Sequence, residues 1–352
     1  TANDLAQIEQ ASSTSTKIRN QYLSQINFKN GYVKFNRANR DDLYNGKRLS
    51  SIEVFKEETN NTFSKIKDFR LYNDDYFIAS SGSNYLSAVG GNSSNQIMAY
   101  KRLRLNSINE KNVNTNATEK SHVFMYNTQK LPNKASFSVD HWGYYNGENN
   151  SEFYPQIPPN DFGANRDIDV TKVTASMLEK VVYPTGGWMK VNFEANNNYP
   201  GARIASTEEH DPDSGKTITT SYTYSGGVSS IGLQPNYTKR LRCYSTQIVG
   251  GGPMYGQSTI VTGQSLTAFS NASAGKMVGY SNVDITYGLN GEFGRSNFQY
   301  VQEDPIPRKY PSVFGDPEFD FYLPRTNGNL ISRTDYSAGN TEVKKTINTY
   351  DP

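Results

Sequence analysis

The stretch ARIASTEEHDPDSGKTITTSYTY, residues 202–224, has the pattern of a strand, a polar turn and a returning strand. The segment DPDSG supplies the Pro and Gly that are typical of a turn. In the returning strand, Tyr222 and Tyr224 are two positions apart, so they lie on one face while the hydroxyl-rich residues between them lie on the other. The stretch therefore predicts a β-hairpin with a tyrosine-bearing face.

The same pattern recurs at residues 48–72, 102–126 and 328–351. A separation of 20 or 21 positions relates corresponding residues of the four units: Leu49 with Phe69, Leu105 with Tyr126, Ile204 with Tyr224, and Leu330 with Tyr350. A single hairpin is marginally stable in water, so such units must pair edge to edge or pack on a neighbour. Long insertions separate the units, which predicts a decorated array of hairpins in a curved sheet or shell.

Composition agrees with broad sheets. Only 35% of the 352 residues are hydrophobic, but 12% are aromatic, and 25 of them are Tyr. Chains that lack a folded structure are poor in aromatic residues, so we expect a folded protein. The net charge of +2 argues against nucleic-acid binding, and no apolar run approaches the ~20 residues that span a bilayer. The first residue is Thr, which indicates a processed or excised chain whose lack of a signal peptide does not argue for the cytoplasm.

Two segments have helical patterns. Residues 1–22 carry apolar side chains at loosely helical spacing and predict an N-terminal helical segment. Residues 171–180, TKVTASMLEK, predict a second short helix. The remainder, residues 23–352, is expected to be the β-hairpin array, with a possible internal boundary near residues 150–170.

Several stretches resemble a known family. DPDSG with SYTY, and GNLISRTDY with INTYD, resemble the degenerate tyrosine–aspartate (YD) repeats of Rhs-type proteins. FNRANRDDLYNGKRLSSIEVF, LPNKASFSVDHWGYYNGENN and YPTGGW with VNFE are similar to large secreted or surface proteins of Bacteroidetes-type bacteria. The likeness covers most of residues 20–351. The YD units are few and imperfect: His210 stands where the repeat prefers Tyr, and Ser337 where it prefers Asp.

The resemblance implies a non-enzymatic scaffold segment of a longer exported YD/Rhs-like protein. Such a segment would enclose, carry or display a partner or cargo, secreted or on the outer face of the outer membrane. Its partners would be other segments of the parent chain, a cargo, or outer-membrane export machinery. The resemblance implies no cofactor, no catalytic residue and no toxin activity in these residues.

The stretch DHWGYYNGENN, residues 140–150, supports two hypotheses. Trp142, Tyr144 and Tyr145 would form a platform for sugar rings, and the chain would then be an extracellular glycan- or protein-binding module. Alternatively, a strand SFSVDHW runs into an Asn-Gly turn that is packed by its own aromatic residues. The sequence favours the second hypothesis.

Other motifs have simple structural explanations. YPTGGW predicts a tight hairpin with a two-residue Gly-Gly turn, and KRLRL predicts a strand with outward basic side chains. Asp211 and Asp213 would bind at most a weak Ca²⁺, and a type I turn explains them more simply. The single Cys243 excludes an internal disulfide, and the scattered His122, His141 and His210 argue against zinc.

A glycan-processing enzyme is the third hypothesis. Glu318 and Asp320, two positions apart in GDPEFDFYLP, would lie on one strand face. Glycosidases need two carboxyl groups facing each other across a cleft. The sequence alone does not place two carboxyl groups in this way.

Overall fold

The computed structural model describes residues 21–59, 61–80, 82, 86, 93–153, 155–156, 163–196, 199–229, 238–248, 253–261, 278–304, 306–307, 321–322 and 326–350. These residues are mainly in β-strands, with a short helix α2 (Ser93–Ala99). The predicted N-terminal helix falls almost wholly outside them, and Gln21 and Tyr22 are not helical.

One antiparallel sheet dominates the structure. It has fourteen strands, which in spatial order are β1 (Gln25–Phe28), β2 (Gly31–Asn39), β3 (Lys47–Glu57), β4 (Phe63–Tyr72), β7 (Ser107–Lys111), β8 (Thr118–Tyr126), β9 (Leu178–Val182), β10 (Trp188–Ala195), β11 (Ala202–His210), β12 (Thr217–Ser229), β15 (Val278–Tyr287), β16 (Arg295–Tyr300), β19 (Leu330–Tyr336) and β20 (Glu342–Ile347).

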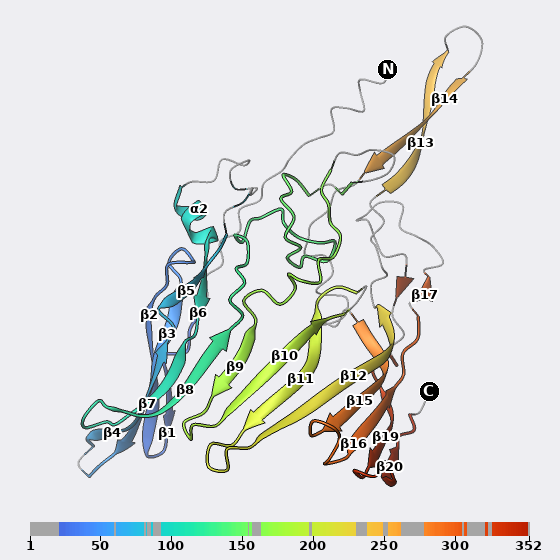
Figure 1. The fold of residues 1–352 in the computed structure, drawn as a ribbon. Coiled ribbons are helices and arrows are strands. Elements are labelled where there is room, and N and C mark those ends of the chain that lie inside the picture. The colour runs from blue at the N-terminus through green and yellow to red at the C-terminus, as the bar shows by residue number, and fades with distance from the viewer. Residues whose placement is uncertain are drawn as a thin grey trace.

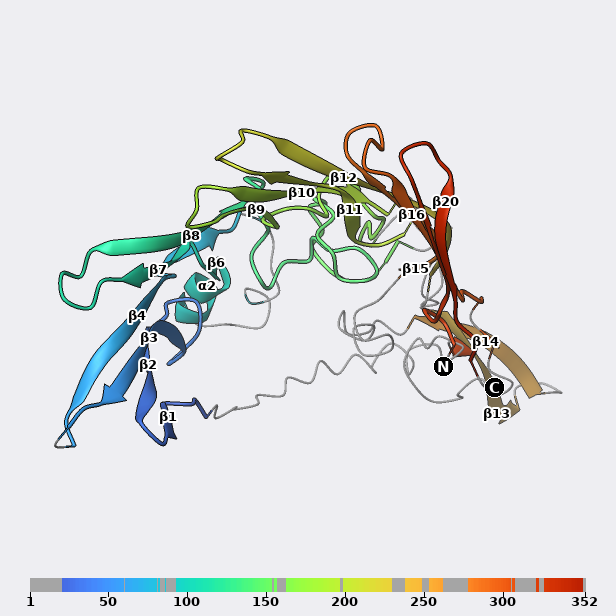
Figure 2. The same ribbon diagram turned by 90° about the horizontal axis from the view of Figure 1, so that it is seen from below.

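The spatial order of the strands is their order along the chain (Figure 1). Three two-stranded hairpins are inserted between neighbours: β5 (Asp75–Ile78) with β6 (Lys101–Arg104), β13 (Thr238–Ile248) with β14 (Pro253–Val261), and β17 (Ile306–Pro307) with β18 (Phe321–Tyr322). The large sheet bends into an arch whose edges do not meet (Figure 2). The predicted array of sequential hairpins is therefore confirmed, as one open, curved sheet.

The two faces of the sheet differ in chemistry. Tyr222 and Tyr224 pair with the aliphatic Ile285 and Val283 of β15, whereas Thr223 between them pairs with Asp284. Directly paired residues share a face, so the predicted alternation is confirmed.

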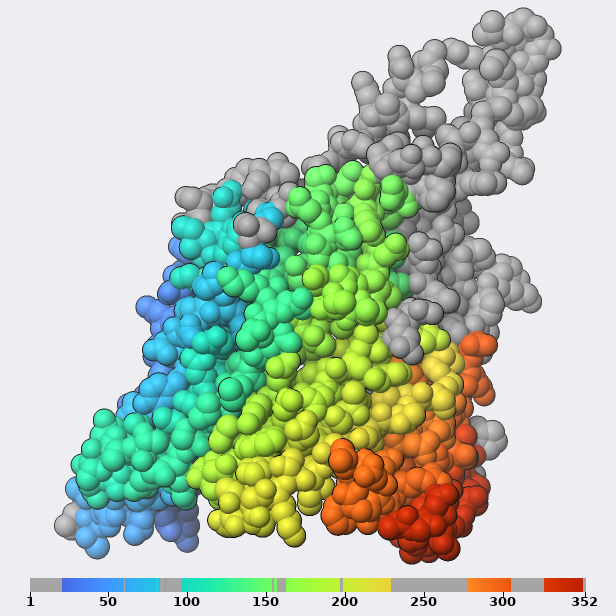
Figure 3. All heavy atoms as spheres, viewed as in Figure 1, coloured from blue at the N-terminus to red at the C-terminus, as the bar shows by residue number. Residues whose placement is uncertain are grey.

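The aromatic face is the inner one. The ring of Phe77 in β5 packs edge-on against Tyr126 of β8 at 4.9 Å, and the β5–β6 hairpin lies inside the arch (Figure 2). The outer face is uncovered, because its strands follow one another from blue to red across the surface without a second layer (Figure 3).

A polar contact recurs where β-bulges occur. The Asn36 amide in β2 donates to Ser51 Oγ of β3 at 3.0 Å, and the Asn192 amide in β10 donates to Ser206 Oγ of β11 at 3.0 Å. In both pairs of strands the register shifts immediately after the asparagine. A bulge increases the local twist, so the recurring bulges help to bend the sheet.

The 20-residue spacing predicted from sequence has a direct structural cause. The Tyr126 hydroxyl donates a hydrogen bond to the Leu105 carbonyl at 2.7 Å. The Tyr224 hydroxyl donates to the Ile204 carbonyl at the same distance. The Tyr350 hydroxyl donates to the Leu330 carbonyl at 2.9 Å. In the first unit Phe69 has no hydroxyl, and the Asn73 amide donates to the Leu49 carbonyl at 3.0 Å instead.

These hydrogen bonds close the hairpins where their ladders end. In each unit, the residue whose carbonyl accepts this bond lies two positions before a serine. That serine forms the pair at the open end of the hairpin, where the two strands stop pairing. These end pairs are Ser51 with Arg70, Ser107 with Val123, Ser206 with Ser221, and Ser332 with Ile347. Beyond that pair the strands separate, and a backbone carbonyl needs another donor. The tyrosine hydroxyl supplies it in three units, and the Asn73 amide supplies it in the first.

The sheet itself contains little buried apolar surface. The buried hydrophobic residues of the described part are Ala99, Ala135, Phe137, Trp142, Ala164 and Ala175, none of which lies in the large sheet. Most side chains in its strands are half-buried or exposed.

Two predictions of local structure need correction. Residues 171–176 form turns and β9 begins at Leu178, so the predicted helix at 171–180 is wrong. Thr171, Val173 and Thr174 are β-branched, which disfavours helix, and Ser176 adopts a left-handed conformation with φ of 58°. YPTGGW forms the predicted hairpin between β9 and β10, but through a longer turn in which the amide of Tyr183 bonds to the Gly187 carbonyl at 2.8 Å.

Candidate functional site

The connection between β8 and β9 is the most tightly packed part of the described chain. It runs along the upper rim and inner side of the arch beside the β5–β6 hairpin (Figures 1 and 2). Most of the buried hydrophobic residues, including Phe137 and Trp142, belong to it, together with buried polar residues such as Asn133, Asp140 and Arg166. Side chains from distant parts of the sequence therefore meet in this connection, residues 127–177, which forms a loop layer on the sheet.

Asp140 organises the turn at residues 140–144. Its carboxylate accepts the backbone amides of Trp142 at 2.8 Å and Tyr144 at 2.9 Å. Its carbonyl accepts a hydrogen bond from the buried guanidinium of Arg166 at 2.6 Å. The predicted strand SFSVDHW is therefore wrong: the residues are irregular, His141 and Trp142 lie in a turn, and Val139 forms an isolated bridge with Tyr145. The Asp side chain competes with strand pairing for the backbone amides.

Burial shifts the ionisation of this turn. Burial raises the pKa of Asp140 to about 6, although the amides of Tyr144 and Trp142 partly oppose the shift. Burial also lowers the pKa of the neighbouring His141 to about 4, and the nearby Arg166 acts in the same direction. At neutral pH the carboxyl is therefore charged and the imidazole is neutral.

The three aromatic residues predicted as a platform do not share one exposed surface. Trp142 is only 6% exposed, so its ring faces the interior of the loop layer. Tyr144 is half-buried and packs over Gly201, whose φ is +81° and whose missing side chain leaves room for the ring. Tyr145 is half-buried and lines a polar cavity of about 370 Å³ with Ser136, Ser138 and other residues. A ligand platform at these residues stays a prediction.

An ion pair with the buried Asp42 connects the loop layer to the β2–β3 turn. Asp42, in the β2–β3 turn, accepts two hydrogen bonds from Arg40 at 2.6 and 2.7 Å and one from the Leu103 amide at 3.1 Å. Lys134, 92 positions away, donates to its carbonyl at 2.8 Å. Burial alone would raise the pKa of Asp42, but the bonds from Arg40 and Leu103 and the charge of Lys134 lower it to about 2.

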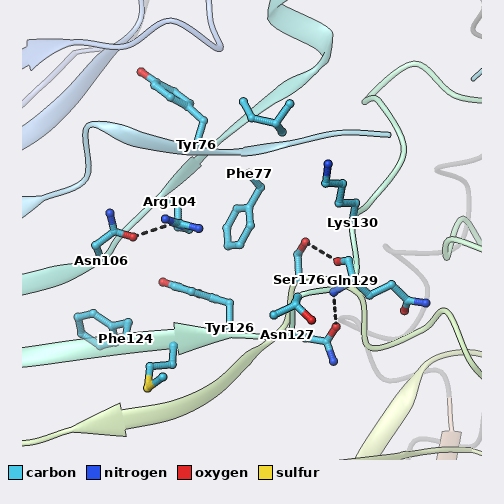
Figure 4. Close-up of a pocket in the computed structure, with 13 residues that line it drawn as sticks. Tyr76, Phe77, Arg104, Asn106, Phe124, Tyr126, Asn127, Gln129, Lys130 and Ser176 are labelled. Carbon is cyan, nitrogen blue, oxygen red and sulfur yellow. Dashed lines mark hydrogen bonds between the residues drawn. The ribbon is translucent and has the colours of Figure 1, made fainter. Parts of the chain in front are cut away.

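An open cavity of about 560 Å³ lies between the β5–β6 hairpin, the end of β8 and residues 127–130 (Figure 4). Phe77 extends into it from β5 toward Tyr126, with Arg104 on one side and Lys130 on the other. Its volume falls in the range of roughly 300–1,000 Å³ that small-molecule sites occupy. This cavity is larger than the polar cavity beside Tyr145, and apolar and polar side chains both line it.

The polar groups around the cavity differ in how they are engaged. Arg104 forms an ion pair with Asp75 and donates to the Asn106 amide oxygen at 2.8 Å. The Asn127 amide donates to Glu179 at 2.7 Å. By contrast, the side chain of Lys130 forms no hydrogen bond or ion pair with any described residue. Lys130 is exposed and available to a ligand.

The basic strand KRLRL has a structural role. Residues 101–104 form β6 as predicted, but their side chains are half-buried instead of pointing to solvent. Arg102 donates to the Pro132 carbonyl at 2.6 Å, and Lys101 pairs with Asp41 at 3.3 Å. These two contacts bind the β5–β6 hairpin to the loop layer at Pro132 and to the β2–β3 turn at Asp41.

The weak Ca²⁺ site and the paired carboxylates that the sequence leaves open gain no support from the described residues. The Asp211 carboxylate caps its own turn by accepting bonds from the Asp213 amide at 3.1 Å and the Ser214 hydroxyl at 2.7 Å, which confirms the turn. No group of three His, Cys, Asp or Glu suited to a metal occurs among the described residues. Glu318 and Asp320 lie outside the described residues, and Cys243 lies in β13 without a described side chain.

Sequence reasoning missed the residues that shape the rim. Phe77, Lys130, Lys134 and Asp42 come from segments up to 92 positions apart, and no periodic pattern relates them. The one available signal is the alternation in DDYFI, which places Tyr76 and Phe77 on opposite faces of a short strand.

Comparisons with known proteins give no family. A scan against models of protein families and a search of curated proteins both find no match. In the part of the chain that the structure describes, no helix is long and apolar enough to cross a membrane.

Proposed function

We propose that the chain is a non-enzymatic structural segment of a larger exported protein, in which it forms part of a shell that encloses, carries or displays a cargo. The observation that carries this proposal is the state of the sheet edges. Both edge strands are exposed at every position, β1 over Gln25–Phe28 and β20 over Glu342–Ile347. Such edges present unpaired backbone groups that a further strand can join.

The β1 edge is the stronger candidate for a junction. Ile26 and Phe28 are 47% and 49% exposed, and β1 carries no charged residue. Natural proteins protect free edges with Lys, Pro or bulges. The β20 edge does carry Lys344 and Lys345. A neighbouring strand of the parent chain would cover Ile26 and Phe28 and pair with the free backbone of β1.

The repeated closure of the hairpins supports the same proposal. Each unit adds strands to the edge left by the previous one, and its tyrosine or asparagine closes the end of its own ladder. Nothing in this geometry limits the number of units. The resemblance to YD/Rhs-like proteins fits an array of this kind, and it makes the cell surface and outer-membrane export machinery the proposed setting.

Native mass spectrometry of the protein from its source tests the proposal. We expect these residues within a longer polypeptide, or with co-purifying cargo or export proteins. Hydrogen exchange should then show β1 amides protected in the native particle and unprotected in the isolated chain. A complete, monomeric 352-residue protein with unprotected β1 amides would overturn the proposal and favour a free-standing binding module.

A further inference from the structure

We propose that the cavity of Figure 4 binds a sugar ring that carries a carboxylate, such as a uronic-acid residue of an acidic polysaccharide. The inference concerns a ligand site and does not depend on whether the chain is part of a shell.

The floor of the cavity suits the flat side of a pyranose ring. Phe77 and Tyr126 meet edge to face at 4.9 Å, so they form a corner of two differently oriented aromatic surfaces. The Tyr126 hydroxyl is held by the Leu105 carbonyl at 2.7 Å, which fixes the orientation of its ring. Rigid aromatic surfaces with a few placed polar groups are typical of small-ligand sites.

The charges around the cavity favour an anion. Arg104 and Lys130 line it, and no Asp or Glu is among the described lining residues. Asp75 balances the charge of Arg104, and Arg104 also lies over the Phe77 ring at 5.6 Å. Lys130 has no such partner among the described residues, and its exposure lets the ammonium move toward a bound carboxylate. A carboxylate would supply the missing partner.

Neutral donors complete the recognition of a sugar. Thr128 and Gln129, which precede Lys130 in the chain, also line the cavity, and their side chains have no partner among the described residues. Ser176 donates its hydroxyl to the Gln129 carbonyl at 3.1 Å and keeps its lone pairs free to accept. Sugar hydroxyls both donate and accept, so they can satisfy all three groups. Ile78, which also lines the cavity, is 52% exposed, so this part of the lining is accessible from solvent.

A matched pair of ligands tests the proposal. Methyl β-D-glucuronide and methyl β-D-glucoside differ only in the carboxylate, and saturation-transfer NMR measures weak binding of each to the full chain. We expect the wild-type protein to bind the glucuronide about tenfold more tightly, the effect of one charge-assisted hydrogen bond. The preference should fall as salt rises, because the contact is partly exposed.

Two variants locate the site. Lys130→Gln should weaken glucuronide binding about tenfold and leave the glucoside unchanged. Lys216→Gln is the control, because Lys216 is also exposed but lies in the distant β11–β12 turn. Phe77→Leu keeps an apolar side chain but removes the ring, and it should weaken both ligands with an unchanged circular dichroism spectrum.

Three results would overturn the proposal. The first is no detectable glucuronide binding by the wild-type protein. The second is equal binding of the two glycosides. The third is a loss in Lys216→Gln as large as that in Lys130→Gln.

Discussion

Removal of the Tyr224 hydroxyl tests the closure of the hairpin ladders most directly. In Tyr224→Phe the ring remains, together with the stacking of Arg203 over it at 4.6 Å. Only the bond to the Ile204 carbonyl at 2.7 Å is lost. That carbonyl lies beyond the last pair of β11 with β12, and burial of the hydroxyl raises the pKa of Tyr224 to about 12. Loss of a partly buried hydrogen bond of this kind should lower the free energy of unfolding by about 1–2 kcal/mol.

Tyr350→Phe is the matched control. The same bond to the Leu330 carbonyl is 2.9 Å long, but Tyr350 is 51% exposed and the Asn348 amide also donates to that carbonyl at 2.9 Å. The expected loss is therefore below about 0.5 kcal/mol.

Urea unfolding followed by circular dichroism measures both variants. Hydrogen exchange is needed beside it, because strand arrays of this length open in parts. In Tyr224→Phe, amides of the β11–β12 ladder near Ser206 should exchange up to about tenfold faster. A Tyr224→Phe protein as stable as wild type would refute the closing role of the hydroxyl. A Tyr350→Phe protein equally destabilised would contradict the argument that exposure and the Asn348 bond weaken its contribution.

Three further perturbations have distinct expected outcomes. Asp140 has a folded pKa of about 6 against an ordinary value of 3.8, so its ionisation lowers stability between those pH values. Between pH 4 and pH 7 the stability of Asp140→Asn relative to wild type should therefore rise by about 2 kcal/mol, measured by urea unfolding across pH; a pH-independent difference would contradict this. The pKa of Asp42 is lowered to about 2, so its charge stabilises the fold above about pH 4, and that contribution is lost as the pH falls through 2. Asp42→Asn should then cost about 2–3 kcal/mol at pH 7, and the difference from wild type should shrink in titrations toward pH 2. Gly294 and Gly328 both have φ of +90°, but a Cβ on Gly294 would lie 2.3 Å from the Tyr336 carbonyl oxygen and one on Gly328 would meet nothing within 4 Å. Thermal unfolding should show Gly328→Ala losing about 1 kcal/mol and Gly294→Ala losing several times more; equal losses would contradict the proposed clash.

The regular part of this fold is predictable because its causes are local. A strand, a polar turn and a returning strand with Tyr at alternate positions predict a hairpin, and the separation of Ile204 from Tyr224 corresponds to a hydrogen bond. The open curved sheet follows from joining such units edge to edge.

The candidate site is not predictable in this way. Its cavity combines β5, β6, β8 and an irregular loop, and no periodic pattern relates Phe77 to Lys130. The loop layer also overrides local propensity. Asp140 draws backbone amides away from strand pairing in SFSVDHW, and Ser176 in a left-handed conformation ends the turns where a helix was predicted.

The agreement between spatial order and chain order bears on how the sheet is built. Each strand of the large sheet needs a partner made just before or just after it, so few distant segments must find one another. Contacts that are close in sequence form quickly, and nearest-neighbour arrays grow from any nucleus. If the chain emerges gradually from one end, each hairpin can form as soon as its second strand has emerged. The two strands are separated by about twenty residues, as Ile204 and Tyr224 are. The edge strand of the folded part would then pair with the next unit. The sheet would gain strands at the rate at which the chain emerges.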